Sequence, residues 1–256
     1  MLEERQVSEA AEKIIRSGLT IALTGAGISV PSGIPDFRSA EGLWARFDPA
    51  EYATISAFHS NPLKVWEMLR EMEKLLRCAQ PNLAHIGMGE MERLGCLRCI
   101  ITQNIDNLHQ AGGSREVIEY HGNAASLTCL ACGRRFGRRE KEGEYTPTCL
   151  CGSILKPDVI FFGEAIPEDA LNRSFHLASS AQALLVVGTS AVVSPANTIP
   201  SIAKRNRACI IEINQERTHL TDSITDIFLQ GNVVDVVPVL VDALKTGLDR
   251  HSRSGD

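Results

Sequence analysis

Short apolar runs alternate with amphipathic stretches along most of this chain. Each apolar run is short enough for a strand that is buried on both faces. The runs lie at residues 20–24, 100–102, 183–187 and 209–213. Stretches with the helical spacing of apolar residues separate them, near residues 81–93, 167–180 and 195–206. This alternation predicts an α/β fold built on a doubly wound parallel sheet.

The beginning of the chain has the pattern of one more helix. Apolar residues recur there at helical intervals, namely Val7, Ala10, Ala11, Ile14 and Ile15. This spacing places the side chains on one face of a helix. We expect the helix to pack beside the strand at residues 20–24 and to end by Gly18.

Two regions interrupt the alternation of strand and helix. Residues 42–78 are rich in large apolar side chains, with Pro49 and Pro62 as breaks, and predict two or three helices inserted after the first strand. Residues 122–157 hold four cysteines, seven glycines or prolines and few aliphatic side chains, so they cannot form much of a core. A small lobe held together by a metal is the natural interpretation.

Composition limits the classes of function. The 256 residues, 44% of them hydrophobic, suffice for one large core or for one core with a small satellite. Because 26 Lys and Arg stand against 31 Asp and Glu, attraction to nucleic acid or to an anionic membrane is not the expected activity. No apolar stretch approaches the roughly 20 residues that span a bilayer, and residues 2–6 show no signal pattern. We therefore expect a cytoplasmic protein with reduced thiols.

Four cysteines form two closely spaced pairs, each followed by a glycine. The pairs are Cys129 with Cys132 and Cys149 with Cys151. Four thiolates at about 2.3 Å make a closed tetrahedral zinc site that stabilises structure. Incidental reduced thiols are the alternative, and the single residue inside the second pair departs from the usual spacing of two. Another pair, Cys96 and Cys99, runs directly into an apolar strand, and we interpret it as core.

The first predicted strand leads into the glycine-rich turn at residues 25–29. A standard dinucleotide-binding fold would have a third glycine at position 30 and a helix directly after it. This chain has Val30 and then Pro31 and Pro35, which push the segment out of helix and into a loop. The turn is suited to a dinucleotide, and the segment after it is suited to covering a bound cofactor.

Polar residues follow the strand at 100–102, where an open α/β sheet places ligand groups. Gln103, Asn104 and Asp106 could form a helix cap alone, but together they exceed what a cap needs. Further along, His121 stands beside Gly122. A lone histidine is more often packed or solvated than catalytic, although a pKa near 6.5 suits proton abstraction at neutral pH.

Small residues end the two later strands. The sequence Gly188-Thr189-Ser190 follows one strand and Asn214 ends the other. Such residues allow close approach of a phosphate or a ribose, although each alone also fits an ordinary strand-to-helix turn.

The predicted metal lobe also carries a cluster of arginines, at 134, 135, 138 and 139, which is followed by several glutamates. We expect these arginines to form a solvated face of the lobe.

Together, these segments resemble the sirtuin family of NAD-dependent protein deacylases. The resemblance rests on the turn at 25–29, the stretch 33–38, the series 102–106, His121-Gly122 and the cysteine quartet. It covers about residues 8–245, with the motifs in the family's order. The turn alone would be weak evidence, whereas the full series is highly specific.

The resemblance implies a Rossmann-like domain that binds NAD, a smaller domain, and a cleft between them for NAD and an acylated lysine. The implied NAD-binding domain comprises residues 1–41, 91–121 and 158–248. The smaller domain comprises a helical part at 42–90 and a zinc-binding module at 122–157, and residues 249–256 form a flexible tail. A flap at residues 30–44, hinged by Gly33 and Gly42, would exclude water from the cleft.

The resemblance also implies roles for individual residues. His121 would act as general base on a ribose hydroxyl, and Asn104 would help to order that ribose for catalysis. Residues implied to bind the cofactor are Gly25, Ala26, Gly27, Ser29, Phe37, Arg38, Gln103, Asn104, Ile105, Asp106, Gly188, Thr189, Ser190 and Asn214. Residues implied to bind the substrate by β-augmentation are Val159, Ile160, Phe161, Phe162, Gly163 and Glu164. The implied zinc ligands are Cys129, Cys132, Cys149 and Cys151.

The expected activity is lysine deacetylation with transfer of the acetyl group to ADP-ribose and release of nicotinamide. Relatives that prefer succinyl or malonyl groups carry a Tyr-x-x-Arg motif that is absent here, so we expect a neutral acyl group. Ser194 stands where many relatives have tyrosine, which leaves that contact open. Protein ADP-ribosylation and non-catalytic sensing of NAD or ADP-ribose are the alternatives. Acetylated proteins are the expected partners, and the oligomeric state stays open.

Overall fold

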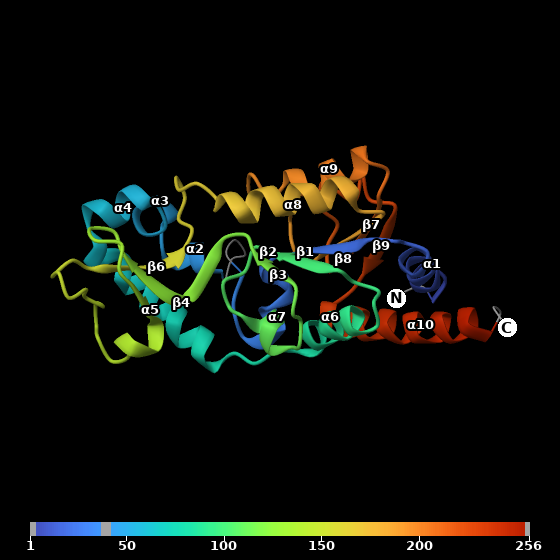
Figure 1. Ribbon diagram of the computed structural model, residues 1–256, viewed down its shortest axis with the longest axis horizontal. Coiled ribbons are helices and arrows are strands. Elements are labelled where there is room, and N and C mark those ends of the chain that lie inside the picture. The colour runs from blue at the N-terminus through green and yellow to red at the C-terminus, as the bar shows by residue number, and fades with distance from the viewer. Residues whose placement is uncertain (1–3, 37–41, 254–256) are drawn as a thin grey trace.

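A parallel sheet forms the centre of the larger part of the molecule (Figure 1). The computed structural model describes residues 4–36 and 42–253. Six strands pair in the order β3-β2-β1-β7-β8-β9, all parallel. They are β1 (Thr20–Thr24), β2 (Cys99–Thr102), β3 (Val117–Glu119), β7 (Ala183–Val187), β8 (Cys209–Asn214) and β9 (Ile227–Gln230). Because β2 and β7 flank β1, the strand order reverses between β1 and β7, which is where such sheets bind ligands.

Helices cover both faces of the sheet, which confirms the doubly wound α/β prediction. Figure 1 shows α8 and α9 on one face, and α6 and α10 on the other. Side chains of β1 divide accordingly, since Ala22 packs with α1, α6 and α10 while Ile21 and Leu23 pack with α8 and α9. The helices are α1 (Glu4–Ile15), α6 (Leu83–Arg93), α7 (Leu108–Ala111), α8 (Glu168–Ser180), α9 (Thr198–Arg205) and α10 (Val233–Arg253).

The four predicted strands are present, but the sequence pattern missed β3, β9 and α10. Both missed strands lie at edges of the sheet, where burial alternates along the strand instead of being continuous. A short alternating run is a weaker signal than an apolar block. Helix α10 contains Pro238 near its start, and proline is a signal against helix interiors.

The smaller part of the molecule combines helices with an antiparallel sheet. Its helices are α2 (Leu43–Arg46), α3 (Pro49–Tyr52), α4 (Ile55–Ser60) and α5 (Pro62–Cys78). Its strands β4 (Gly122–Cys129), β5 (Arg135–Gly137) and β6 (Leu155–Val159) pair in the order β5-β4-β6. Strand β6 crosses residue 157, the predicted end of the zinc module, and the division into domains stays a prediction.

The expectation of two or three helices in residues 42–78 was wrong, because the segment forms four. Three polar side chains each start a new helix by accepting a backbone N–H. Asp48 caps α3 through the N–H of Ala50, and Thr54 caps α4 through that of Ala57. Asn61 caps α5 in the same way. Such caps, together with proline in the first turn of α3 and α5, divide the segment into four separate helices.

One core joins the helices of the smaller part to its sheet. Trp66 is 2% exposed and donates its indole N–H to the carbonyl of Leu155 at 2.9 Å. Arg138 pairs with Glu73 at 2.6 Å and lies over the Trp66 ring. The prediction that all four clustered arginines are solvated was therefore wrong for Arg138, whose side chain is only 15% exposed. Long arginine stems often cover apolar surface in this way.

Within residues 4–36 and 42–253, no helix has the length and apolar character needed to cross a membrane.

Candidate active site

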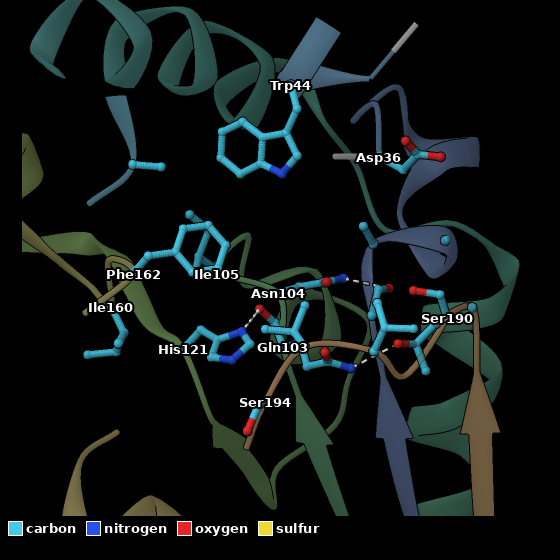
Figure 2. A pocket seen from close by; sticks show the side chains of 18 of the residues that line it. Asp36, Trp44, Gln103, Asn104, Ile105, His121, Ile160, Phe162, Ser190 and Ser194 are labelled. Atoms are coloured by element: carbon cyan, nitrogen blue, oxygen red, sulfur yellow. Dashed lines mark hydrogen bonds between the residues drawn. The ribbon is translucent and has the colours of Figure 1, made fainter. Parts of the chain in front are cut away.

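A cavity of about 800 Å³ lies between the parallel sheet and the smaller part of the molecule. Four strands of the parallel sheet contribute to its wall at their carboxyl ends, namely β1, β2, β7 and β8. The opposite wall comes from α5 and from residues 159–164. Figure 2 shows side chains from both walls pointing toward the same space. A concave site of this size at the switch point of an α/β sheet is suited to a dinucleotide with a second ligand.

Two glycine turns meet at the floor of the cavity. The N–H of Gly27 donates to the carbonyl of Gly188 at 2.8 Å. A Cβ atom on Gly27 would lie 2.7 Å from that carbonyl oxygen, and Gly188 has a positive φ of 58°. Neither position therefore accepts a side chain without a shift of the backbone. The close approach leaves both turns lining the cavity with backbone atoms, as a phosphate site requires.

Gln103 and Asn104 follow β2 and tie three strand ends together. Asn104 is 8% exposed and donates from Nδ2 to the Gly25 carbonyl at 3.1 Å. Gln103 donates from Nε2 to the Thr24 carbonyl at 3.2 Å and to Thr189 Oγ1 at 3.0 Å. These bonds fix both amide side chains along the cavity wall (Figure 2).

Ser29 and Asp106 lie beside the main cavity and line a smaller hollow that opens next to it, of about 30 Å³. Ala26, Asn104 and Ile105 line both spaces. The Ser29 hydroxyl donates to Asp106 Oδ2 at 2.7 Å and accepts from Asn104 Nδ2 at 3.0 Å. The structure thus brings the predicted residues Ser29, Asn104 and Asp106 into one polar network.

A buried histidine completes this network, and sequence reasoning missed it. His85 Nδ1 accepts the N–H of Asn82 at 3.3 Å, which leaves Nε2–H to donate to Ser29 Oγ at 3.3 Å. Burial lowers the pKa of His85 to about 4, so the ring is neutral at physiological pH. The only local signal was a helix cap at Asn82, which says nothing about the distant Ser29.

A second buried histidine lies behind the first. His109 Nε2 is 2.9 Å from Thr24 Oγ1, and the Thr24 hydroxyl donates to Thr102 Oγ1 at 2.9 Å. Burial, with His85 nearby, lowers the pKa of His109 to about 3. The rings of His85 and His109 meet edge to face with their centroids 5.1 Å apart. Two neutral rings in this position support the strand ends without adding charge beneath the cavity.

His121 lies at the other side of the cavity, between β3 and β4. Its Nδ1–H donates to the carbonyl of Gln103 at 3.1 Å (Figure 2). This tautomer leaves Nε2 with a free lone pair, as a general base requires. Burial lowers the pKa of His121 and outweighs the opposite effect of the Gln103 carbonyl. The imidazole is therefore neutral at physiological pH and able to accept a proton.

Residues 159–164 run past His121 and form the wall contributed by the smaller sheet. Ile160 N–H donates to the carbonyl of His121 at 2.9 Å, and Phe162 pairs with Thr54 as an isolated parallel bridge. Phe162 is 45% exposed, and its ring centroid lies 6.3 Å from that of Trp44. These residues present an apolar surface at the cavity, suited to the aliphatic stem of a lysine.

A buried ion pair holds this wall, and the sequence pattern did not reveal it. Lys156 is 5% exposed and lies 2.9 Å from Glu164 Oε2. The same ammonium group donates to the Val159 carbonyl at 2.7 Å, while Glu164 accepts the N–H of Phe161 at 2.7 Å. The two charges thus satisfy backbone groups of Val159 and Phe161 in the wall, which offsets part of the cost of their burial.

The remaining predicted site residues have different outcomes. Thr189 and Ser190 line the cavity next to Asn214, whose Nδ2 donates to the Thr189 carbonyl at 2.9 Å. Ser194 also lines the cavity. Phe37 and Arg38, in the middle of the predicted flap, lie outside the described residues.

The four predicted zinc ligands form one cluster. The sulfur atoms of Cys129, Cys132, Cys149 and Cys151 all lie within 4.8 Å of one another. Cys129 Sγ is 3.5 Å from Cys151 Sγ, and Cys132 Sγ is 3.6 Å from Cys149 Sγ. Sulfur atoms at about 2.3 Å from a tetrahedral zinc would be separated by roughly 3.8 Å, so the cluster fits this metal. The other cysteine pair is core, as predicted, since Cys96 and Cys99 are 7% and 3% exposed.

The chain is similar to known proteins over nearly its whole length. A family model described as the Sir2 family matches residues 25–195. The chain is 43% identical to NAD-dependent protein deacetylase 1 of Pyrobaculum aerophilum, covering 94% of this chain and 95% of the relative. It is also 43% identical to the NAD-dependent protein deacylase of Pyrococcus furiosus, covering 93% and 98%.

Solved structures agree with these sequence relatives. A Sir2 homologue in complex with NAD has a TM-score of 0.88 at 42% identity, covering 94% of each chain. A Sir2 protein with a deacetylated peptide and 3'-O-acetyl ADP-ribose has a TM-score of 0.87 at 35% identity, covering 92% of this chain and 97% of that one.

The cysteine cluster generates a test of metal content. We expect the purified protein to hold about one zinc per chain, and Cys129→Ala to lose it, because three remaining thiolates leave the site incomplete. Elemental analysis measures the metal, and Cys99→Ala is the matched control, since Cys99 belongs to the other Cys-x-x-Cys pair and lies in the core. Zinc retained in full by Cys129→Ala and lost from Cys99→Ala would contradict the assignment.

Proposed function

The chain belongs to the Sir2 family, and from that premise we propose that it is an NAD-dependent protein lysine deacetylase. In this proposal it transfers the acetyl group from lysine to ADP-ribose and releases nicotinamide. Zinc at the four-cysteine cluster has a structural role. The named activities and ligands of the relatives support NAD-dependent deacylation, and the preference for acetyl is our finer inference.

The position of His121 is the observation on which the proposal depends. Its neutral imidazole presents an unprotonated nitrogen to a cavity bounded by glycine turns on one side and by residues 159–164 on the other. A base placed between a dinucleotide site and a peptide site can accept a proton from a hydroxyl of either ligand. A simple dinucleotide sensor would need the glycine turns but no such base.

The residues around the cavity divide the work of binding and catalysis. Bound NAD supplies an electrophilic ribose carbon and an ADP-ribose group that accepts the acyl group. Asn104 and Gln103 orient the ribose through amide groups that the strand ends already hold in place. His121 Nε2 accepts a proton from a ribose hydroxyl, while the Gln103 carbonyl keeps Nδ1 protonated and the ring fixed.

The peptide would bind along residues 159–164. An extended substrate can add to this segment by backbone hydrogen bonding, which is β-augmentation. The cavity wall there is covered by the apolar side chains of Ile160, Phe161 and Phe162. The methylene groups of the acylated lysine would therefore lie against apolar surface. Water is thereby displaced from the region near His121.

Nicotinamide release should depend on acetylated peptide. We expect equal amounts of nicotinamide and deacetylated peptide from NAD and an acetyl-lysine peptide, and none with the unmodified peptide. His121→Tyr should lower the rate by about 10²-fold or more, because removal of a general base has effects of this size. Mass spectrometry and a nicotinamide assay measure both products.

The matched control for this variant is His176→Tyr, which changes an exposed histidine on α8. An unchanged rate in His121→Tyr would remove His121 from the role of base. ADP-ribose retained covalently on a protein, with the peptide still acetylated, would instead support ADP-ribosyl transfer.

The cavity predicts a preference for neutral acyl groups. The end near α5 is lined by Trp44, Met68, Leu69, Met72 and Ile105. Among the described lining residues, the only lysine or arginine is Arg217, which lies past β8 and pairs with Asp222. A buried carboxylate without a cation is costly, so kcat/KM for a succinyl peptide should be about 10²-fold lower than for a butyryl peptide of equal chain length. Equal values for the two peptides would refute the preference.

The pKa of His121 predicts the acid limb of the pH profile. Only neutral imidazole accepts a proton, and burial holds the pKa below its ordinary value of 6.5. The acid limb of kcat/KM should therefore have its midpoint below pH 6.5, and kcat/KM should fall as the pH drops through that midpoint. Initial rates at subsaturating peptide measure this profile, with circular dichroism to verify that the protein stays folded. A midpoint above 6.5 would contradict the neutral, buried base.

A further inference from the structure

A fully buried carboxylate lies two residues before the end of β8 that faces the cavity. Glu212 is 0% exposed although its neighbours Ile211 and Ile213 are the apolar residues expected in a central strand. Its two oxygens accept three hydroxyl groups. Thr218 donates to Oε1 at 2.6 Å, and Thr221 and Thr225 donate to Oε2 at 2.7 and 2.8 Å.

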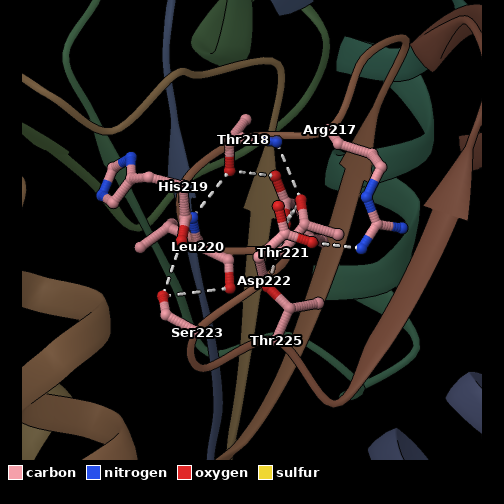
Figure 3. Close-up of polar contacts among 9 residues, drawn as sticks. Arg217, Thr218, His219, Leu220, Thr221, Asp222, Ser223 and Thr225 are labelled. Carbon is pink, nitrogen blue, oxygen red and sulfur yellow. Dashed lines mark hydrogen bonds and ion pairs between the residues drawn. The ribbon is translucent and has the colours of Figure 1, made fainter.

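All three threonines belong to the connection between β8 and β9, residues 215–226, which we name the β8–β9 loop. Figure 3 shows the side chains of Thr218, Thr221 and Thr225 close to one another, while His219 points away from them. The hydroxyl of Thr218 also accepts the N–H of Leu220 at 3.1 Å, and that of Thr221 accepts the N–H of Thr218 at 2.8 Å. Thr218 and Thr221 therefore connect the carboxylate to the loop backbone.

The β8–β9 loop is also part of the cavity wall. Its first five residues, 215–219, line the cavity together with Asn214. Because alternate residues of a strand point the same way, Glu212 and Asn214 lie on one side of β8. The buried carboxylate thus binds the loop from the interior of the protein, while residues 215–219 of the same loop face the cavity.

Stability alone does not explain a glutamate at this position. Burial of a carboxylate costs several kcal/mol unless hydrogen bonds compensate for the lost water, and isoleucine or valine would fill a central strand without that cost. What the carboxylate provides is one acceptor that three separate loop residues share. Long connections without helix or strand are mobile unless their own side chains hold them, and they often carry function.

We propose that Glu212 is a positioning residue for cofactor binding. By holding Thr218, Thr221 and Thr225 it fixes the β8–β9 loop as the wall that receives the adenosine half of NAD. This inference rests on the proposed function and on the implied cofactor-binding role of Asn214, at which we place the adenosine ribose. His121, which would act at the reacting end of the cofactor, lies between β3 and β4 and not in the β8–β9 loop. The loop therefore governs the affinity for NAD and not the chemical step.

Loss of one hydroxyl should therefore weaken cofactor binding selectively. Thr221 and Thr225 do not line the cavity, so their substitution by valine removes no lining side chain. Thr225→Val removes the bond to Glu212, and Thr221→Val removes that bond together with the acceptor for the Thr218 N–H. We expect KM for NAD and the dissociation constant for ADP-ribose to rise roughly fivefold or more in each variant, a typical size for coupling between distinct positions. The kcat at saturating NAD and the KM for acetylated peptide should stay within about twofold, because the loop touches neither reacting group.

The controls separate positioning from general loss of structure. Thr221→Ser and Thr225→Ser keep the hydroxyl and should restore near-native affinity. Thr246→Val removes an exposed hydroxyl on α10 that donates only to the Asp242 carbonyl, and it should have no effect. If a valine variant does not fold, Glu212→Gln provides the second test, since one amide oxygen replaces two acceptors and affinity should again fall.

Titration calorimetry with ADP-ribose measures affinity without turnover. If the wild type binds ADP-ribose but releases no nicotinamide, the proposed function fails while the role of Glu212 is still tested by the valine variants. Unchanged affinity for ADP-ribose in folded Thr221→Val and Thr225→Val would overturn the positioning role. The role would also be overturned by a fall in kcat with unchanged affinity, or by equal losses for NAD and peptide.

Discussion

The close approach of the turns after β1 and β7 is the constraint from which the rest of the site follows. Gly27 and Gly188 are in backbone contact, and neither has space for a side chain. Because the strand order reverses between β1 and β7, this contact forms the floor of the crevice that opens there. The polar residues that follow β2 and β8 then reach the same space from either side. Larger residues at these two positions would separate the strand ends and widen the floor.

Two buried polar networks hold the cavity wall at separate places. One joins Ser29, His85, Asn104 and Asp106, and the other joins Glu212 to the threonines of the β8–β9 loop. The first network joins residues that are distant in the sequence, whereas in the second the threonines belong to the loop that directly follows Glu212. Such networks favour one arrangement strongly, since a broken bond leaves a buried polar group without a partner. A rigid wall follows from polar burial here more than from apolar packing.

The central strands, the metal cluster and the polar strand ends could be predicted from the sequence because each depends on local pattern. Apolar blocks mark buried strands, and cysteine spacing marks a shared metal. The edge strands β3 and β9 were missed and the four helices of residues 42–78 were miscounted, because edge burial and individual caps are weak signals. His85, Lys156 and Glu212 could not be predicted for a different reason. His85 pairs with Ser29 on a distant segment. The partners of Lys156 and Glu212 lie in the loop directly after each strand, and no local pattern indicates that these loops fold back onto the strand.

The smaller sheet connects the metal cluster to the candidate active site. Strand β4 begins at Gly122, directly after His121, and ends at the ligand Cys129. Its partner β6 pairs Leu155 with Cys129 and Val159 with Gly122, so the same two strands extend from the cluster to the cavity. A Cβ atom on Gly122 would clash with the Asp158 carbonyl, which shows how closely the strands approach beside His121. Zinc at the far end would therefore fix the spacing of the two strands that lead to the proposed base and to the proposed substrate wall.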